Sequence, residues 1–469
     1  MTSERFRGRT LASVLGYTAM IAGAIGLFQL VRWFGATLEA PLPTVAVRAT
    51  STKPHADVLL HVLLALAAVI IAARVCGTLC KRLHQPPVVG EVLAGILLGP
   101  SLLGRVSPTA SAYVLPPSVA PFLSIIAQIG VILFMFLVGL ELNANQLKRR
   151  THATVAISHA SILFPFVLGS CLAIGLYPKL STRDVPFTVF ALFLGVSLSV
   201  TAFPVLARIL TDRGVHKTHL GIIALTCAAV DDVTAWCLLA FVIAAAKAKL
   251  SGAIITVALT ALYVGGMLLV ARPIIVRAVR AQELRKTVSQ NAIAVVVVGV
   301  LCSTLATEAM GIHAIFGAFL VGAIIPHDSR LAQDLTHKLE DLVVVLFLPA
   351  FFAFTGMRTE IGLVHGASQW LLCLVIIAAA SIGKFGGSFV AARIAGFGNR
   401  DAASLGILMN TRGLVELIVL NIGLDLRILS PTLFTMLVLM AITTTFATTP
   451  ILNLLMRNAT EPEGEPITP

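Results

Sequence analysis

The chain alternates between long apolar runs and short polar stretches. Its apolar runs begin near residues 13, 58, 86, 119, 153, 186, 218, 252, 288, 311, 341, 366, 401 and 431. A helix needs about 20 mainly apolar residues to cross the hydrocarbon core of a bilayer. The pattern therefore predicts an all-α polytopic membrane protein with about fourteen membrane-spanning helices.

The composition supports this prediction. Only 12% of the 469 residues are charged and 57% are hydrophobic, whereas soluble domains carry about 25% charged residues. The net charge of +12 could indicate a nucleic-acid partner, but the basic residues form short clusters between apolar runs. Such clusters signal membrane topology rather than a phosphate-binding face, so no nucleic-acid partner is expected. The cysteines lie in or beside apolar runs and are interpreted as small core residues.

The basic clusters also predict the orientation. If the N-terminus is cytoplasmic, the cytoplasmic loops contain the clusters at residues 81–82, 148–150 and 277–286, and the opposite loops contain fewer basic residues. This bias predicts an even number of spans with both termini in the cytoplasm, and a bacterial inner membrane is the simplest location. The first run follows three arginines, as in a signal peptide, but it is longer than a typical signal core. A retained helix is therefore favoured over a cleaved signal.

The apolar runs divide the chain into three parts. Residues 1–57 are expected to form an extra N-terminal helix and a linker, residues 58–457 the transmembrane domain, and residues 458–469 a disordered tail. A weak repeat within the transmembrane domain relates residues 58–245 to residues 288–457, with a linking helix at 252–280.

The repeat is visible in two short alignments. Residues 91–95 (EVLAG) align with 313–317 (HAIFG), and residues 134–139 (FMFLVG) align with 351–356 (FFAFTG). Two halves of six spans each, joined by one linking span, would have opposite orientations, as in transporters built from inverted repeats. Chance recurrence of Gly and Phe in apolar helices is the alternative.

Six charged residues lie well inside apolar runs, where an unpaired charge costs at least about 2.5–3.5 kcal/mol. They are Glu91, Asp231, Asp232, Lys384, Arg412 and Glu416. Such residues usually face a water-filled cavity or pair with one another, so they are the candidate functional residues.

Asp231 and Asp232 are adjacent in an apolar helix, where neighbouring side chains point about 100° apart. One aspartate should therefore face an ion path while the other faces a partner inside the protein. Burial and mutual repulsion disfavour two negative charges at once, so a proton and a small monovalent cation can compete for one carboxylate. Such competition is the minimal chemistry of exchange. The alternative is a pair of permanently protonated acids that hold helices together.

Lys384 lies among small residues (SIGKFGG, residues 381–387), which allow another helix to approach closely. The aspartate pair is the natural partner of this buried ammonium. If cation binding breaks the bridge, Lys384 can release a second proton. A constant structural salt bridge is the alternative.

Two spans are interrupted by polar or helix-weakening residues, at 199–204 (SVTAFP) and at 410–413 (NTRG). Unwound backbone at the bilayer centre is tolerated only where it lines a cavity or packs in protein. There, free carbonyl groups and the hydroxyls of Ser199 and Thr201 could replace water around a cation. The four half-helix ends would present opposing partial charges.

The other charged residues have more than one possible role. Arg412 and Glu416 are one turn apart, and they either neutralise each other or compensate the dipoles of the broken helix. Glu91 is either a partner of Arg412 or an acid of a cytoplasmic funnel. His313 is interpreted as a histidine at a helix start rather than as a pH sensor. The sequence contains no nucleophile–base or metal-ligand cluster, so we expect neither an enzyme nor a cofactor.

Several stretches, in order, resemble the monovalent cation:proton antiporters of the Kef-type and bacterial sodium/proton exchanger branch, which includes plant cation/proton exchangers. They are residues 87–101 (PVVGEVLAGILLGPS), 136–142 (FLVGLEL), 201–208 (TAFPVLAR), 229–233 (AVDDV), 311–319 (GIHAIFGAF) and 411–416 (TRGLVE). Each stretch alone is a weak signal, whereas the ordered set is specific and extends over residues 58–457.

The resemblance implies the inverted-repeat sodium/proton antiporter fold, with about thirteen core helices, one extra N-terminal helix and two crossing discontinuous helices. These crossing helices match the spans around Thr201 and Thr411. The resemblance further implies that Asp232 is the ion-binding carboxylate and that Asp231 bridges to Lys384. Family members are homodimers with a dimerisation domain and a core domain that moves like an elevator, and exchangers with both aspartates and the lysine are typically electrogenic.

We therefore expect secondary antiport of Na⁺, in preference to K⁺, against H⁺. The lack of a nucleotide-binding regulatory domain, which Kef-type potassium systems have, favours a stand-alone exchanger. One rival is a gated monovalent cation efflux channel, which would dissipate gradients without obligatory proton coupling. The other is a sodium-coupled symporter of an organic solute, which would need a roomier and more polar cavity.

Overall fold

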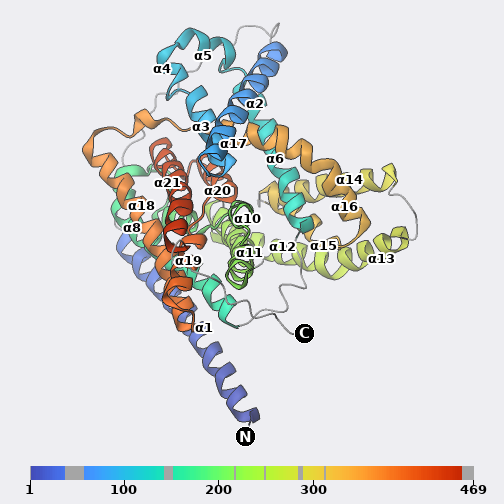
Figure 1. Ribbon diagram of the computed structural model, residues 1–469, viewed down its shortest axis with the longest axis vertical. Helices are drawn as coiled ribbons and strands as arrows, with labels where there is room; N and C mark the ends of the chain where they lie inside the picture. Colours follow the sequence, from blue (N-terminus) through green and yellow to red (C-terminus); the bar gives the residue numbers. More distant parts are fainter. Residues whose placement is uncertain are drawn as a thin grey trace.

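A computed structural model describes residues 2–36, 38, 58–141, 152–215, 218–247, 250–283, 289–310 and 313–456. Every regular element in these ranges is a helix (Figure 1). Within them, eleven helices are long and apolar enough to cross a membrane, and the remaining predicted spans consist of shorter helices. The prediction of an all-α polytopic membrane protein is confirmed.

The helices of the first half are α1 (Thr2–Gly35), α2 (Val58–Arg82), α3 (Pro87–Leu98), α4 (Leu103–Val106), α5 (Pro108–Val114), α6 (Ala120–Glu141), α8 (His152–Leu180), α9 (Phe187–Ser199), α10 (Phe203–Asp212) and α11 (His219–Lys247). A continuous run of α12 (Leu250–Gly266), a π-helical segment (Met267–Ala271) and α13 (Arg272–Glu283) follows. The second half contains α14 (Gln290–Ala309), α15 (Ala314–Ile324), α16 (Arg330–Leu342), α17 (Leu348–Met357), α18 (Gly366–Ile394), α19 (Asn399–Met409), α20 (Leu414–Asp425) and α21 (Pro431–Met456).

One predicted span begins earlier than expected. α16 continues through a π-helical segment (Val343–Phe347) directly into α17, so the run near residue 341 is the second part of a longer helix. α16 buries Leu331, Ala332 and Leu335 and carries charged residues elsewhere. Its apolar stripe is too narrow to give a continuous apolar run, because a one-sided helix alternates apolar and polar residues.

Two spans are discontinuous, as the polar interruptions predict. α9 ends at Ser199 and α10 begins at Phe203, whereas α19 ends at Met409 and α20 begins at Leu414. Pro204 contributes to the first break because it has no N–H to donate to the carbonyl group four residues earlier. Both breaks lie in the same part of the fold and contact each other.

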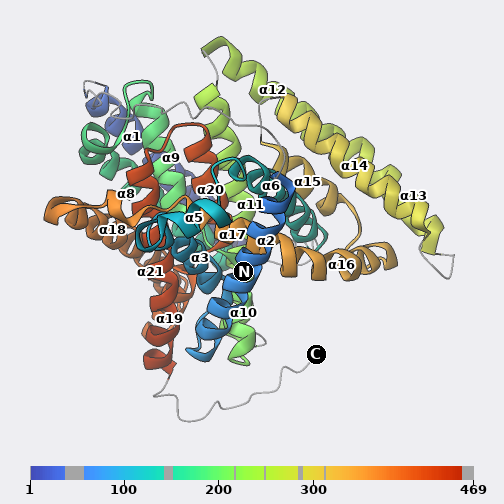
Figure 2. The same cartoon turned by 90° about the horizontal axis from the view of Figure 1, so that it is seen from above.

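The helices form two bundles, which Figures 1 and 2 show from two directions. In the core bundle (α8–α11 and α18–α21), α8 packs against α9, α11 and α18, and α19 packs against α18 and α21. In the scaffold bundle (α2–α6 and α14–α17), α3 packs against α2 and α17, and α15 packs against α6 and α14. The α12–α13 run connects α11 of the core bundle to α14 of the scaffold bundle.

The first helix packs against the core bundle. α1 contacts α8 and α9, and the rings of Phe28 and Phe166 lie 6.0 Å apart. Gly35, at the end of α1, lies directly against the ring of Phe187. Retention of this helix stays a prediction. The linker at 39–57, the basic cluster at 148–150 and the tail at 458–469 lie outside the described residues.

Glycines allow the two halves to interlock within the scaffold bundle. A Cβ atom on Gly95 of α3 would lie 2.1 Å from the carbonyl oxygen of Ala353 on α17. A Cβ atom on Gly322 of α15 would lie 2.2 Å from the carbonyl oxygen of Phe136 on α6. Only a residue without a side chain permits such an approach of two backbones. α3 therefore meets α17 in the same way as α15 meets α6.

The partner helices make matching contacts in return. A Cβ atom on Gly356 of α17 would lie 2.2 Å from the carbonyl oxygen of Val92, and one on Gly139 of α6 would lie 2.3 Å from that of Phe319. Gly139 and Gly356 thus occupy equivalent places, as the alignment of residues 134–139 with 351–356 predicts.

The register of α3 and α15 differs from the predicted one. A Cβ atom added to Gly90 of α3 would lie 2.4 Å from the carbonyl oxygen of Cys76. A Cβ atom added to Gly317 of α15 would lie 2.4 Å from the carbonyl oxygen of Ser303. Gly90 is therefore the equivalent of Gly317. The predicted alignment of residues 91–95 with 313–317, which equated Gly95 with Gly317, is wrong, because glycines recur often enough in these helices to fit a false register.

We predict that Gly356→Ala destabilises the protein, because its new Cβ atom would overlap the α3 backbone, which cannot move aside cheaply. Overpacking of this kind typically costs about 1–3 kcal/mol. Gly299→Ala on α14 is the control, since a Cβ atom there meets nothing within 4 Å and alanine favours helix. Thermal unfolding in detergent should show a lower midpoint for Gly356→Ala only. Equal midpoints would contradict the interlocked packing.

Candidate functional site

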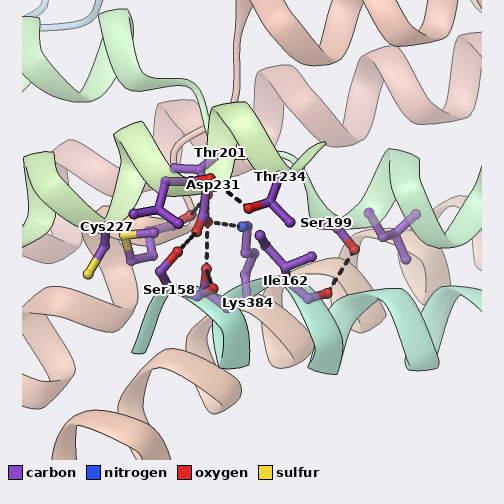
Figure 3. A network of polar contacts seen from close by, with 12 residues as sticks. Ser158, Ile162, Ser199, Thr201, Cys227, Asp231, Thr234 and Lys384 are labelled. Carbon is purple, nitrogen blue, oxygen red and sulfur yellow. Dashed lines mark hydrogen bonds and ion pairs between the residues drawn. The ribbon is translucent and has the colours of Figure 1, made fainter. Parts of the chain in front are cut away.

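The two adjacent aspartates lie in the middle of α11, inside the core bundle. Asp231 has no exposed surface, and Asp232 is 6% exposed. Because consecutive side chains on a helix point in different directions, the two carboxylates contact different parts of the bundle. Figure 3 shows the network around Asp231.

Four donors surround the carboxylate of Asp231. Oδ1 accepts a hydrogen bond from Ser158 Oγ at 2.6 Å. Oδ2 accepts from Ser161 Oγ at 2.5 Å, from Thr201 Oγ1 at 2.8 Å and from Lys384 Nζ at 3.0 Å. The ion pair between Lys384 and Asp231 that the sequence suggested is therefore present, and both of its side chains are fully buried.

Small residues bring Lys384 within reach of Asp231. A Cβ atom on Gly383 would lie 2.7 Å from Cα of Pro165, and one on Gly387 would lie 2.6 Å from the carbonyl oxygen of Ala160. α18 can therefore lie directly on α8, as the run of small residues around Lys384 predicts.

Asp232 has a different environment. Its carboxylate accepts a hydrogen bond from the backbone N–H of Phe203, the first residue of α10. Its Oδ1 atom is buried and has no hydrogen-bond partner among the described residues. Asp231 is thus saturated with donors, whereas Asp232 has an oxygen available for a proton or a cation.

The two helix breaks contact each other through backbone and side-chain hydrogen bonds. The N–H of Ala202 in the first break donates to the carbonyl oxygen of Thr411 in the second at 3.0 Å. The hydroxyl of Thr201, which contacts Asp231, also lies 3.2 Å from the carbonyl oxygen of Met409, where α19 ends. These contacts place the unwound backbone beside the aspartates.

Arg412 and Glu416 combine both of the roles considered for them. The guanidinium donates to the carbonyl oxygens of Ser197 at 2.9 Å and Leu198 at 2.6 Å, at the C-terminal end of α9. It also pairs with Glu416, in the first turn of α20, at 3.2 Å. A positive charge at a helix C-terminus and a negative charge at a helix N-terminus both interact favourably with the helix dipole.

Two candidates lie away from the aspartates. The hydroxyl of Ser199 donates to the carbonyl oxygens of Gly195 and Ile162, at 2.7 and 3.0 Å, and not to either carboxylate. Glu91 belongs to α3 in the scaffold bundle, and no hydrogen bond or ion pair joins it to Arg412 in the described ranges. His313 directly precedes α15, as expected for a helix-start histidine.

Sequence reasoning missed Ser158 and Ser161. They are three residues apart on α8 and therefore share a face, which was a usable signal. Serine is nevertheless common in membrane helices, where its hydroxyl can bond its own backbone, so the pair does not stand out without the contact to Asp231.

A cavity of about 550 Å³ lies between the two bundles. Its polar lining residues are Gln128, Thr304, Glu308, His313, Asn421 and Asp425. At its edge, Arg358 at the end of α17 pairs with Asp425 of α20 at 2.6 Å and donates to Asn421 at 3.0 Å. Asn421 in turn donates to Thr355 at 2.7 Å. The cavity thus has an acidic lining, and polar contacts cross from scaffold to core beside it.

A family of sodium/hydrogen exchangers, described by its transmembrane region, matches residues 69–457 of the chain. The chain belongs to this family. The family is one of transporters and not of enzymes, and membership supports cation/proton exchange by an integral membrane protein.

The names of the relatives include both Na⁺/H⁺ and K⁺/H⁺ antiporters. The Na(+)/H(+) antiporter NhaS4 of Synechocystis sp. is 44% identical over 397 residues, which cover 84% of this chain and 97% of that protein. Cation/H(+) antiporter 18 of Arabidopsis thaliana is 40% identical over 86% of this chain and 50% of its own length. The K(+)/H(+) antiporter 1 of Saccharomyces cerevisiae is 33% identical over 80% of this chain and 42% of its own length. The chain therefore spans half or less of the plant and yeast relatives.

A solved structure has the same fold. The sodium proton antiporter MjNhaP1 from Methanocaldococcus jannaschii, determined at pH 8, matches with a TM-score of 0.61 and 15% identity, covering 85% of this chain and 97% of that one. The expected antiporter fold, with its two crossing discontinuous helices, is therefore confirmed.

We predict that Lys384→Met destabilises the protein, because it removes the only charged donor that a fully buried carboxylate has among the described residues. Loss of one partner of a buried ion pair typically costs about 3–5 kcal/mol. Adding Asp231→Asn should restore part of the loss, since no charge then lacks its partner. Lys179→Met, at an exposed position of α8, is the control. The midpoint of unfolding in detergent is measured for each variant. If the double variant unfolds at or below the midpoint of Lys384→Met, the pairing of Lys384 with Asp231 is contradicted.

Proposed function

We propose that the protein is a secondary antiporter that exchanges a monovalent cation, Na⁺ in preference to K⁺, for H⁺ by competition at Asp232. The contrast between the two aspartates carries this proposal. Both oxygens of Asp231 accept hydrogen bonds, whereas Oδ1 of Asp232 is buried without a partner in the described part of the chain. A buried polar atom without a partner is destabilising, and a bound proton or cation removes that destabilisation.

The second helix break offers further ligands for the cation. Oδ1 of Asn410 and Oγ1 of Thr411 are buried and lack hydrogen-bond partners among the described residues. Together with Asp232 and Thr201 they would surround the ion with oxygen atoms, which small hard cations prefer. Ser199 can join this set only if its hydroxyl oxygen turns from Gly195 toward the ion.

Lys384 supplies the second part of the proposed cycle. A cation at Asp232 repels the neighbouring ammonium, which can then leave Asp231 and release a proton. Each transported cation would thereby displace one proton from Asp232 and one from Lys384, and transport would be electrogenic. If the bridge to Asp231 is constant, only one proton is exchanged for each cation.

Alternating access is proposed to occur by movement of the core bundle against the scaffold bundle. The network of Asp231 lies entirely within the core bundle, and the glycine contacts that join α3 to α17 and α6 to α15 lie entirely within the scaffold bundle, so each bundle can move as a unit. The cavity between them is the candidate route of the ion on one side, and its acids Glu308 and Asp425 would attract cations. Glu91 is proposed as an acid of the opposite, cytoplasmic funnel.

The proposed arrangement in the cell follows the sequence expectations. The exchanger would consist of residues 58–457, with repeats at 58–245 and 288–457 joined by a linking helix at 252–280. It would be a homodimer in a bacterial inner membrane with both termini in the cytoplasm. A cation channel or a sodium-coupled symporter is less well supported, because the family and the named relatives are exchangers.

We predict that Asp232→Ala abolishes cation-driven proton movement, because the competing site is lost. Purified protein in proteoliposomes with an internal pH dye should respond to Na⁺ and Li⁺ more strongly than to K⁺ and Rb⁺. Asp328→Asn, at a position whose side chain is 80% exposed, should retain wild-type activity. Full activity of Asp232→Ala, or no response of the wild type to any cation, would refute the proposal.

Competition also predicts the pH dependence. If proton and cation exclude each other at one carboxylate, acidification raises the apparent KM for the cation, by up to about tenfold for each pH unit. The maximal rate at saturating cation should change far less. Initial rates measured across a matrix of cation concentration and pH provide the test. A KM independent of pH, with only the maximal rate falling, would indicate separate proton and cation sites.

A further inference from the structure

Two serines of α8 contact Asp231, and neither has a role in the cycle described above. Ser158 Oγ lies 2.6 Å from Oδ1 of Asp231, and Ser161 Oγ lies 2.5 Å from Oδ2. Both serines are fully buried. Hydroxyls that donate to an ionised carboxylate are typically about 2.5–2.7 Å from it, so these distances fit a negatively charged Asp231.

Asp231 therefore has donors of two kinds. Lys384 brings a positive charge from α18, whereas the serines and Thr201 bring hydroxyls that do not ionise. If only Lys384 held the carboxylate, its departure would leave a buried negative charge without sufficient compensation, which is strongly disfavoured. Figure 3 shows Ser158 and Lys384 converging on Asp231.

We propose that Ser158 and Ser161 are positioning residues that hold Asp231 as a carboxylate while Lys384 is detached from it. The proposal rests on the proposed function, because it assumes that Lys384 leaves Asp231 when a cation binds Asp232. Its consequence is a division of charge in the site. The exchanged protons reside on Asp232 and Lys384, and Asp231 is a fixed negative charge throughout the cycle.

The other charged groups near Asp231 do not replace the serines. Asp232 lies beside it on α11 and would repel it when ionised. Arg412 and Glu416 act electrostatically on Lys384, but they pair with each other. His159, between the serines on α8, has its Nδ1 atom 3.0 Å from the carbonyl oxygen of Val155 in its own helix.

The two serine hydroxyls also differ in the other hydrogen-bond acceptors within their reach. Ser161 Oγ lies 2.8 Å from the carbonyl oxygen of Ser158 as well as close to Asp231, so its proton can turn to its own helix. Ser158 Oγ has only the contact with Asp231 in the described ranges. The loss of Ser158 should therefore have the larger effect of the two single substitutions.

The experiment compares Ser158→Ala, Ser161→Ala and the double variant with the wild type in proteoliposomes. Without the hydroxyls, the state with Lys384 detached is disfavoured, so cation binding with proton release needs a lower proton concentration. For the double variant we expect an apparent KM for Na⁺ raised by about tenfold, a smaller change in maximal rate and an activity optimum at more alkaline pH. Ser158→Thr, which keeps the hydroxyl, should restore the wild-type profile.

Ser170→Ala is the matched control, because Ser170 is a buried serine of the same helix that donates to the carbonyl oxygen of Ala191 at 3.3 Å. Its removal should affect stability but not the pH profile. If the double variant keeps the KM, the pH optimum and the charge moved per cation of the wild type, the serines are only structural and the proposal is overturned.

Two further outcomes are decisive. If the double variant does not fold, the single variants decide: a KM raised by about threefold in Ser158→Ala supports the proposal, and an unchanged KM overturns it. A wild type that moves no protons in response to any cation contradicts the proposed function itself. Normal exchange by the wild type with unaltered serine variants contradicts only the role of the serines.

Discussion

Two unwound backbone segments within the membrane need hydrogen-bond partners from the protein itself, and the core bundle is arranged around this need. Each break satisfies part of the other through the bond from Ala202 to Thr411. Arg412 binds the free carbonyl oxygens at the end of α9, and Thr445 of α21 bonds both the N–H and the C=O of Arg412. A segment that would be unstable alone thus becomes a hydrogen-bonded, polar crossing next to α11.

This crossing makes the two aspartates unequal. Asp231 points toward α8 and α18, which supply two serines and a lysine, so its charge is fully compensated within the bundle. Asp232 points toward the start of α10, where one backbone N–H leaves an oxygen of the carboxylate open. Adjacent residues of identical chemistry therefore acquire different surroundings because a helix turns by about 100° per residue.

The sequence predicted the features that follow from strong energetic demands. A buried lysine requires a carboxylate, and an interrupted apolar run requires a packed crossing, so a bridge from Lys384 to the aspartate pair and both breaks could be predicted. Only the family resemblance implied that Asp231 is the partner. Features with a smaller energetic cost could not be identified from the sequence. A serine in an apolar helix can bond its own backbone, as Ser199 does, or a distant carboxylate, as Ser158 does. Recurring glycines fit more than one register, so only the contacts between backbones relate Gly95 to Gly322.

The two halves pack in a similar way but differ in one charged group. The difference lies on the long helix that follows each break, which is α11 in the first half and α21 in the second. In each half, the long helix that follows a break hydrogen-bonds the backbone of that break: α11 through Asp232 to Phe203, and α21 through Thr445 to Arg412. A hydroxyl satisfies such a backbone group permanently and carries no charge. A carboxylate satisfies the same kind of group and still has an oxygen for a proton or a cation. The fold therefore needs a hydrogen-bond acceptor at both places, whereas the proposed exchange needs a titratable acceptor at only one, Asp232.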